Sequence, residues 1–147
     1  MAKLPGVLMV ALLAGCHAPP SGLPTNEVLR FGVGHMGGSV DFVVKSDGTA
    51  EYRESGGPEG DIEGTGKVAP GAMSELAARL ETNGFCSPVS ARSTGVPDEA
   101  RPSAAVRLPG LDCRVQMWDG EFRDDAAAQA ALRAIEQIGA SIRKQRQ

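Results

Sequence analysis

Apolar and polar residues alternate in two stretches of the first third of the chain. Alternation with a period of two places every second side chain on the same face of a β-strand. The sequence therefore predicts strands over residues 28–33 and 39–45. The apolar positions of these two strands are Leu29, Phe31, Val33, Val40, Phe42 and Val44.

The turn after the second strand determines which side chains face each other in the hairpin that follows. With Asp47 and Gly48 as a two-residue loop, Phe42 would face Arg53. A three-residue loop that begins one residue earlier, with Gly48 in the left-handed region, places Phe42 opposite Tyr52 instead. We predict the three-residue loop because it collects the apolar side chains on one face. The apolar pairs are then Phe42 with Tyr52 and Val44 with Ala50.

The middle of the chain has a weaker pattern. Residues 54–66 are rich in glycine and acidic side chains, and we interpret them as a loose excursion, with a short fourth strand near Ile62 and Val68. Apolar residues then recur at helical spacing and predict a helix over residues 70–83, which the Asn-Gly pair at 83–84 ends. The apolar stripe of this helix consists of Met73, Leu76, Ala77 and Leu80.

A second hairpin is predicted near the C-terminus. Residues alternate on both sides of a Pro-Gly turn at 109–110, which predicts that Val106 faces Cys113 and Ala104 faces Val115. Before this hairpin, residues 85–89 are predicted to be another strand or an extended segment, and residues 90–102 a loop.

The last predicted element is a helix over residues 124–144. Asp124 and Asp125 suit its N-terminus, where backbone N–H groups need acceptors. Its apolar side chains recur at a spacing that places them on one face. They are Ala128, Ala131, Leu132, Ile135, Ile138 and Ile142.

The order of these elements predicts the fold class. Single strands and helices do not alternate regularly, as they would in a parallel sheet. We therefore predict an α+β fold: an antiparallel β-sheet built from hairpins, with two helices packed on one face. We expect one domain over residues 28–147, because the 132 residues that would remain after loss of the first fifteen are too few for two.

Several segments of the chain resemble an uncharacterised family of small secreted bacterial domains. The resemblance implies the fold and implies no activity. The segments are Lys45-Ser46-Asp47-Gly48-Thr49 with Tyr52, Gly66-Lys67-Val68, the leucine-rich helix from Leu76 to Leu80, and Gly84-Phe85.

The N-terminus resembles the processing signal of bacterial lipoproteins. Lys3 precedes an apolar run over residues 7–13, which is too short to span a bilayer, and Leu13-Ala14-Gly15-Cys16 matches the lipobox. The resemblance implies that residues 1–15 are removed as a signal peptide. It also implies that Cys16 carries a thioether-linked diacylglycerol and an acylated amino group. The alternative is a secreted protein with a chance cysteine at this position.

Acylation predicts a protein of the cell envelope whose first partner is the membrane. His17 stands where an aspartate would favour retention in the inner membrane, so for a Gram-negative cell we expect the outer membrane, facing the periplasm. The proline, serine and glycine residues of 16–27 predict a tether. Loss of residues 1–15 removes Lys3 and no acidic residue, which changes the net charge from −3 to −4. A mildly acidic chain without a basic stripe argues against a nucleic-acid partner.

Two cysteines remain once Cys16 is assigned to the lipid. In an oxidising compartment, Cys86 and Cys113 are expected to form a disulfide. The alternatives are two separate buried thiols or a metal site. A metal site is disfavoured because Cys86, Cys113 and His35 lack the close ligand spacing of metal-binding motifs. We expect neither a metal nor another cofactor.

Two glycine-rich stretches match nucleotide-binding motifs only in part. Residues 32–37 have the glycine spacing of a dinucleotide-binding loop, but a strand is predicted to follow instead of the required helix. Residues 64–67 resemble the end of a phosphate loop, yet Asp61 replaces the first glycine and Val68 the final serine or threonine.

The titratable residues give no catalytic arrangement in the sequence. We interpret His35 as an exposed loop residue, because a Cys-His pair would require a reduced cysteine in an oxidising compartment. Two carboxylate pairs suggest acid–base or calcium chemistry in principle. We interpret Asp61 and Glu63 as a solvated loop, and Asp124 and Asp125 as helix-capping residues.

Trp118 is the residue that most suggests an interaction. On the second hairpin it falls on the same face as Arg114, opposite the core-facing residues, and an exposed tryptophan beside an arginine would suit a partner contact. The alternative is that Trp118 packs under the final helix or the Phe122 loop. We therefore expect a non-catalytic binding or structural module. The alternatives are an envelope hydrolase or a small inhibitor of a periplasmic enzyme.

Overall fold

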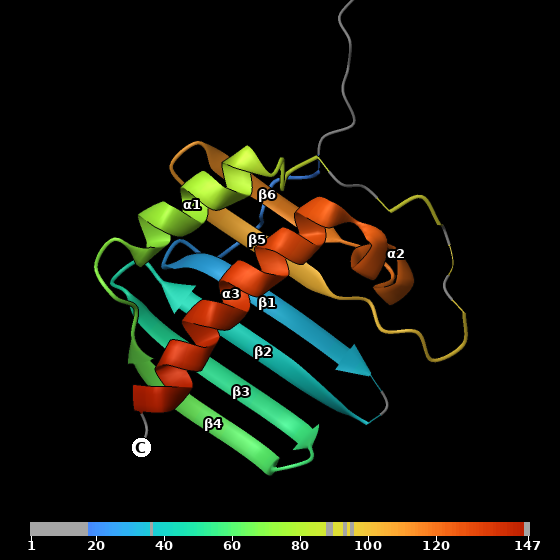
Figure 1. Ribbon diagram of the computed structural model, residues 1–147, viewed down its shortest axis with the longest axis horizontal. Coiled ribbons are helices and arrows are strands. Elements are labelled where there is room, and N and C mark those ends of the chain that lie inside the picture. Colours follow the sequence, from blue (N-terminus) through green and yellow to red (C-terminus); the bar gives the residue numbers. More distant parts are fainter. Residues whose placement is uncertain (1–17, 36, 88–89, 93, 95, 146–147) are drawn as a thin grey trace, which may run out of the picture.

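The computed structural model describes residues 18–35, 37–87, 90–92, 94 and 96–145. Within these ranges the chain forms a six-stranded antiparallel sheet, and its helices lie across one face of that sheet (Figure 1). The α+β class and the placement of the helices on one face are confirmed. A short third helix, which the sequence did not predict, accompanies the two expected ones.

The sheet has the strand order β4-β3-β2-β1-β5-β6. β1 is central, because it pairs with β2 on one side and with β5 on the other, and so joins the two hairpin regions. The strands are β1 (Glu27–His35), β2 (Gly38–Lys45), β3 (Thr49–Gly57), β4 (Gly60–Lys67), β5 (Ser103–Leu108) and β6 (Leu111–Gln116). The helices are α1 (Ala72–Thr82), α2 (Asp119–Asp124) and α3 (Ala126–Gln145).

Both predicted hairpin registers are confirmed. Between β2 and β3, Phe42 pairs with Tyr52, and Gly48 has a φ of 80° in the three-residue loop. Between β5 and β6, Val106 pairs with Cys113. In each hairpin the length of the turn sets the register. A shift of one residue would move the apolar side chains of one strand to the face away from the helices.

The interpretation of residues 54–66 as a loose excursion is wrong. β3 continues to Gly57 and β4 returns from Gly60, so most of this stretch forms a long hairpin. Cross-strand ion pairs such as Arg53 with Glu63, whose Nε and Oε1 lie 2.9 Å apart, accompany the backbone ladder. The short fourth strand expected near Ile62 is part of β4, whereas Val68 lies just beyond its end. β4 is an edge strand and buries little apolar surface, so its hydrophobic pattern does not show its full length.

The end of α1 is a tight turn in which a phenylalanine is buried. Gly84 adopts a φ of 66°, and the Phe85 N–H donates to the Leu80 carbonyl at 2.9 Å. This is the bond of a Schellman motif, and Phe85 itself is fully buried beside the helix it ends. Residues 85–87 therefore form a turn. The strand or extended segment predicted over residues 85–89 is not present in this part of it. Residues 88 and 89 lie outside the described ranges.

The final helix begins later than predicted. Asp124 is the last residue of α2, and Asp125 leaves the helical conformation with a φ of −84° and a ψ of 118°. The Asp125 carboxylate accepts the Ala128 N–H at 2.8 Å and caps α3. The sequence thus identified the capping residue correctly in Asp125 but missed the short helix before it, which buried Phe122 holds against the core.

The main hydrophobic core lies between the sheet and the helices. Side chains from the helix-covered face of the strands pack against the apolar stripes of α1 and α3. Among the described residues, no helix is both long and apolar enough to cross a membrane. The largest fully buried apolar side chains are Phe42, Phe85, Leu29, Leu80, Ile142, Val44, Val106 and Val115.

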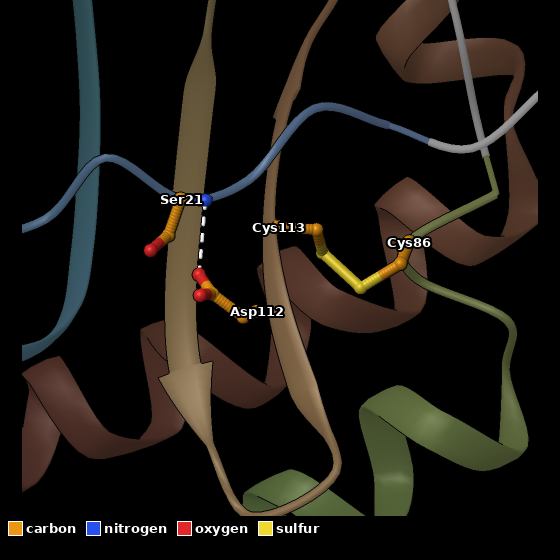
Figure 2. The surroundings of a disulfide bond; sticks show 4 residues. All are labelled: Ser21, Cys86, Asp112 and Cys113. Atoms are coloured by element: carbon orange, nitrogen blue, oxygen red, sulfur yellow. Dashed lines mark hydrogen bonds between the residues drawn. A yellow bond between two sulfur atoms is a disulfide. The ribbon is translucent and has the colours of Figure 1, made fainter.

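The predicted disulfide between Cys86 and Cys113 is present, with Cα atoms 5.7 Å apart (Figure 2). It links the turn after α1 to β6, one edge strand of the sheet. The cross-link therefore holds the end of α1 against the edge strand β6.

Residues 18–26, which we name the docked segment, do not form the free tether that was expected. This segment crosses β6 and β5 on the side of the sheet away from the helices (Figure 2). Ser21 is fully buried there and Leu23 is 5% exposed. The segment was predicted to be a tether because its composition is that of a flexible linker. Composition does not show that its backbone groups form hydrogen bonds with β5 and β6.

Candidate functional site

Trp118 lies outside the strand on which the sequence placed it. β6 ends at Gln116, and Trp118 immediately precedes α2, where its side chain is half-buried. The indole Nε1 donates to the Arg92 carbonyl at 3.3 Å, and the Arg101 guanidinium carbon lies 5.0 Å from the ring centroid. The indole is therefore engaged by the loop over residues 90–102.

Arg114 has different partners from Trp118. It is exposed on β6, and its Nε donates to the Ser21 carbonyl of the docked segment at 3.1 Å. The structure thus does not combine Trp118 and Arg114 in a common anchor. Cys16, the predicted lipidation site, lies outside the described residues.

The glycine-rich stretches are parts of strands. Gly32 and Gly34 lie within β1 and pair with Asp41 and Ser39, so the helix that a dinucleotide motif requires is missing at this position. Residues 64–67 similarly lie within β4. His35 ends β1, and its side chain lies outside the described atoms.

The loop over residues 90–102 is held to α2 by Glu121. The Glu121 carboxylate accepts the Ala91 N–H at 2.8 Å and the Arg92 N–H at 3.1 Å, and it accepts the Ser90 hydroxyl at 2.6 Å. It also accepts the Trp118 N–H at 3.3 Å, at the start of its own helix. The Ser90 hydroxyl and these backbone donors lower the pKa of Glu121.

Glu99 fixes the other half of the same loop. Its carboxylate accepts Arg92 Nη2 at 2.6 Å, the Gly120 N–H at 3.0 Å and the Val96 N–H at 3.0 Å. The hydrogen bond from Arg92, followed by that from Gly120, lowers the pKa of Glu99 from 4.5 to about 2. The described residues of the loop, together with Trp118 and α2, therefore form one fixed unit, which we name the loop platform (residues 90–92, 94, 96–102 and 118–124).

A tight turn at residues 96–99 forms the outer part of the loop platform. The Glu99 N–H donates to the Val96 carbonyl at 3.1 Å, Pro97 occupies the second position, and Asp98 has a φ of 62°. Such a φ is typical of the third position of a type II turn. Val96 is 61% exposed and is the only large apolar side chain left exposed among the described residues.

An open depression of about 660 Å³ lies beside this turn. The platform provides most of its wall, and Val33 and Gly37 from the region joining β1 to β2 provide the rest. Asp119 and Arg123, which form an ion pair, lie at its edge. The depression thus presents apolar and paired charged groups on a fixed surface.

Three other concave regions offer less chemistry, and the first is an opening of about 230 Å³ between α1 and α3. An apolar groove of about 210 Å³ lies between α3 and the sheet, and Tyr52 at its wall donates its hydroxyl to Glu54 at 2.6 Å. On the opposite face, a polar depression of about 280 Å³ contains carboxylates held in ion pairs, such as Asp41 with Arg30 at 3.2 Å. Within the described residues, no group of three or more histidine, cysteine, aspartate or glutamate side chains is arranged to hold a metal ion.

Sequence reasoning missed Glu99, Glu121 and Val96. The stretch 90–102 has the polar, proline-containing composition of an ordinary loop, and nothing in it shows which acceptors its backbone will find. One signal was available, because Glu121 follows Trp118 by the spacing of a helix-capping glutamate. Pro97-Asp98 was a second signal, typical of a turn.

The chain was compared with known proteins. No protein-family model matches it, and no curated protein matches it.

We predict that the Glu99 carboxylate stabilises the fold in a pH-dependent way. Because its pKa is lower in the folded state than its ordinary value of 4.5, its contribution is present above about pH 4.5 and is lost as the pH falls towards 2. Urea unfolding of the wild type and of Glu99→Gln should therefore differ at pH 7, with the variant less stable. The difference should narrow steadily from pH 4.5 to pH 3. A difference that stays constant from pH 7 to pH 3 would contradict this role.

Proposed function

We propose that the protein is a non-catalytic binding module of the cell envelope, anchored through acyl chains on Cys16, and that its loop platform contacts a protein partner. The observation that carries the proposal is the fixed state of the platform. Glu99 and Glu121 together accept five backbone N–H groups, those of Ala91, Arg92, Val96, Trp118 and Gly120. A loop that is already ordered loses less conformational entropy when it binds.

The same carboxylates are poorly suited to acid–base catalysis. A general base works best when its pKa lies near the pH at which the enzyme operates. Glu99, with a pKa of about 2, stays ionised at neutral pH, and its oxygens are occupied by the donors that order the loop. These hydrogen bonds are therefore better explained by positioning of the loop than by proton transfer.

The exposed groups of the platform favour a protein over a small ligand. Val96 projects from a fixed turn beside a wide, open depression, whereas small ligands bind in pockets that enclose most of their surface. Protein interfaces combine an apolar centre with a polar rim. Val96 and Pro97 would supply the centre, and Asp119 and Arg123 the rim.

The anchor is proposed from the lipobox at residues 13–16. Each CH₂ group of an acyl chain contributes about 0.8 kcal/mol when it is buried in the bilayer, so two or three chains would hold the protein on a membrane almost permanently.

Cys16→Ser should release the protein from the membrane. The variant lacks the thiol that would carry the diacylglycerol, so fractionated cells should contain it outside the membrane fraction. His17→Ser, a change at the next residue, is the matched control and should remain in the membrane fraction with an acylated Cys16. Mass spectrometry of the two mature products completes the measurement. A Cys16→Ser protein that stays in the membrane fraction would refute the anchor.

A photo-crosslinking residue at Asp98 tests the platform. In intact envelopes it should form one discrete protein adduct, and an additional Val96→Asp change should reduce the adduct about tenfold, equivalent to losing one modest interface contact. The same crosslinker at Glu59, in the exposed turn between β3 and β4, is the control and should not form that adduct. Equal adducts at Asp98 with and without Val96→Asp would contradict the proposed use of the platform.

A further inference from the structure

We propose that the domain sits directly on the bilayer, with the end that carries the Cys86–Cys113 disulfide facing the lipid. This inference rests on the proposed acylation of Cys16. It goes beyond that proposal because it assigns the membrane-facing surface of the domain. The docked segment connects the proposed anchor to the sheet.

The first residues of the docked segment form hydrogen bonds with both chain regions that the disulfide joins. The Ala18 N–H donates to the Cys86 carbonyl at 2.9 Å. The Arg114 N–H, on β6 next to Cys113, donates to the Pro19 carbonyl at 2.8 Å. Because the disulfide joins Cys86 to Cys113, the segment starts on a part of the molecule that is itself covalently fixed.

The middle of the docked segment is held by β6. The Ser21 N–H donates to an Asp112 carboxylate oxygen at 3.0 Å (Figure 2). Arg114 Nε donates to the Ser21 carbonyl at 3.1 Å. Ser21 is fully buried at this position. Its side-chain and backbone donors lower the pKa of Asp112, so the carboxylate that holds the segment is ionised at neutral pH.

The last part of the docked segment is held by β5. Arg107 donates to the Leu23 carbonyl at 2.7 Å and to the Pro24 carbonyl at 3.0 Å. The Leu23 side chain is almost completely buried. The segment is therefore bound at its beginning, middle and end, and cannot extend as a spacer unless these contacts break.

The chain between the anchor and the first fixed residue is very short. Consecutive Cα atoms are about 3.8 Å apart, so the Cα of Cys16 lies within about 8 Å of the Cα of Ala18. A free tether over residues 16–27 would instead reach roughly 40 Å when extended. With acyl chains on Cys16, the turn after α1 and the adjoining part of β6 must lie close to the lipid headgroups.

Figure 1 shows which parts of the domain point away from that surface. The chain enters beside β6 and the end of α1, whereas the turn between β3 and β4 lies at the opposite end of the molecule. Ser87, next to Cys86, and Glu59, in the β3–β4 turn, are both exposed and therefore suit a matched pair of probes.

The test uses the acylated full-length protein in phosphatidylcholine vesicles that contain a lipid with a nitroxide on its headgroup. A fluorescent amino acid is placed at Ser87 in one sample and at Glu59 in the other. Fluorescence at position 87 should be quenched several-fold more than at position 59. Insertion of ten Gly/Ser residues between His17 and Ala18 should abolish this difference while the protein still floats with the vesicles.

The outcomes separate this inference from the proposed function. If the protein floats with the vesicles but positions 87 and 59 are quenched equally, or if the insertion changes nothing, the assigned orientation is wrong and the anchor stands. If the acylated protein does not float with the vesicles, the anchor itself fails, and the orientation fails with it.

Discussion

The contacts made by β6 hold the docked segment and the turn after α1 against the sheet. β6 is an edge strand, and edge strands carry unpaired N–H and C=O groups that favour unwanted strand pairing. Here the Pro19 carbonyl accepts the Arg114 N–H, and the disulfide from Cys86 fixes the same strand. The docked segment therefore supplies an acceptor at this edge and holds the chain from Ala18 onward against the sheet.

Four carboxylates of the molecule bind its own backbone. Asp112 orders the docked segment, Asp125 caps α3, and Glu99 and Glu121 order the loop platform. Each carboxylate accepts backbone N–H groups that have no backbone acceptor in a loop or at a helix end. In this way a chain rich in glycine and proline forms fixed surfaces outside its regular elements, which is the property that a binding module needs.

Local patterns in the sequence were sufficient to predict both hairpin registers and the two longer helices. Phe42 with Tyr52 and Val106 with Cys113 could be paired because alternation and turn length agree on one register. The disulfide could be expected because only Cys86 and Cys113 remained once Cys16 was assigned to lipid. These predictions depend on residues close in sequence or on simple counting.

The features that escaped prediction depend on contacts between distant residues. The fourth strand was expected near Ile62, but the full length of β4 was not, because β4 is held by its backbone ladder with β3 and its side chains bury too little to form a longer pattern. The Ser21 N–H donates to Asp112, ninety-one positions later, and no linker composition reveals such a contact. The same reason explains why the role of Glu99 and Glu121 in the loop platform was missed. It also explains why Trp118 and Arg114 were predicted to form one partner contact.

The central claim is that the N-terminal segment belongs to the folded domain, and one backbone amide tests it most directly. The Arg114 N–H lies at the outer edge of β6, where the Pro19 carbonyl of the docked segment accepts it at 2.8 Å. Hydrogen exchange followed by NMR should find this amide protected to a similar degree as amides of the inner strand β5. If the Arg114 amide exchanges as fast as one on an open sheet edge while β5 remains protected, the segment is not docked and the account is wrong.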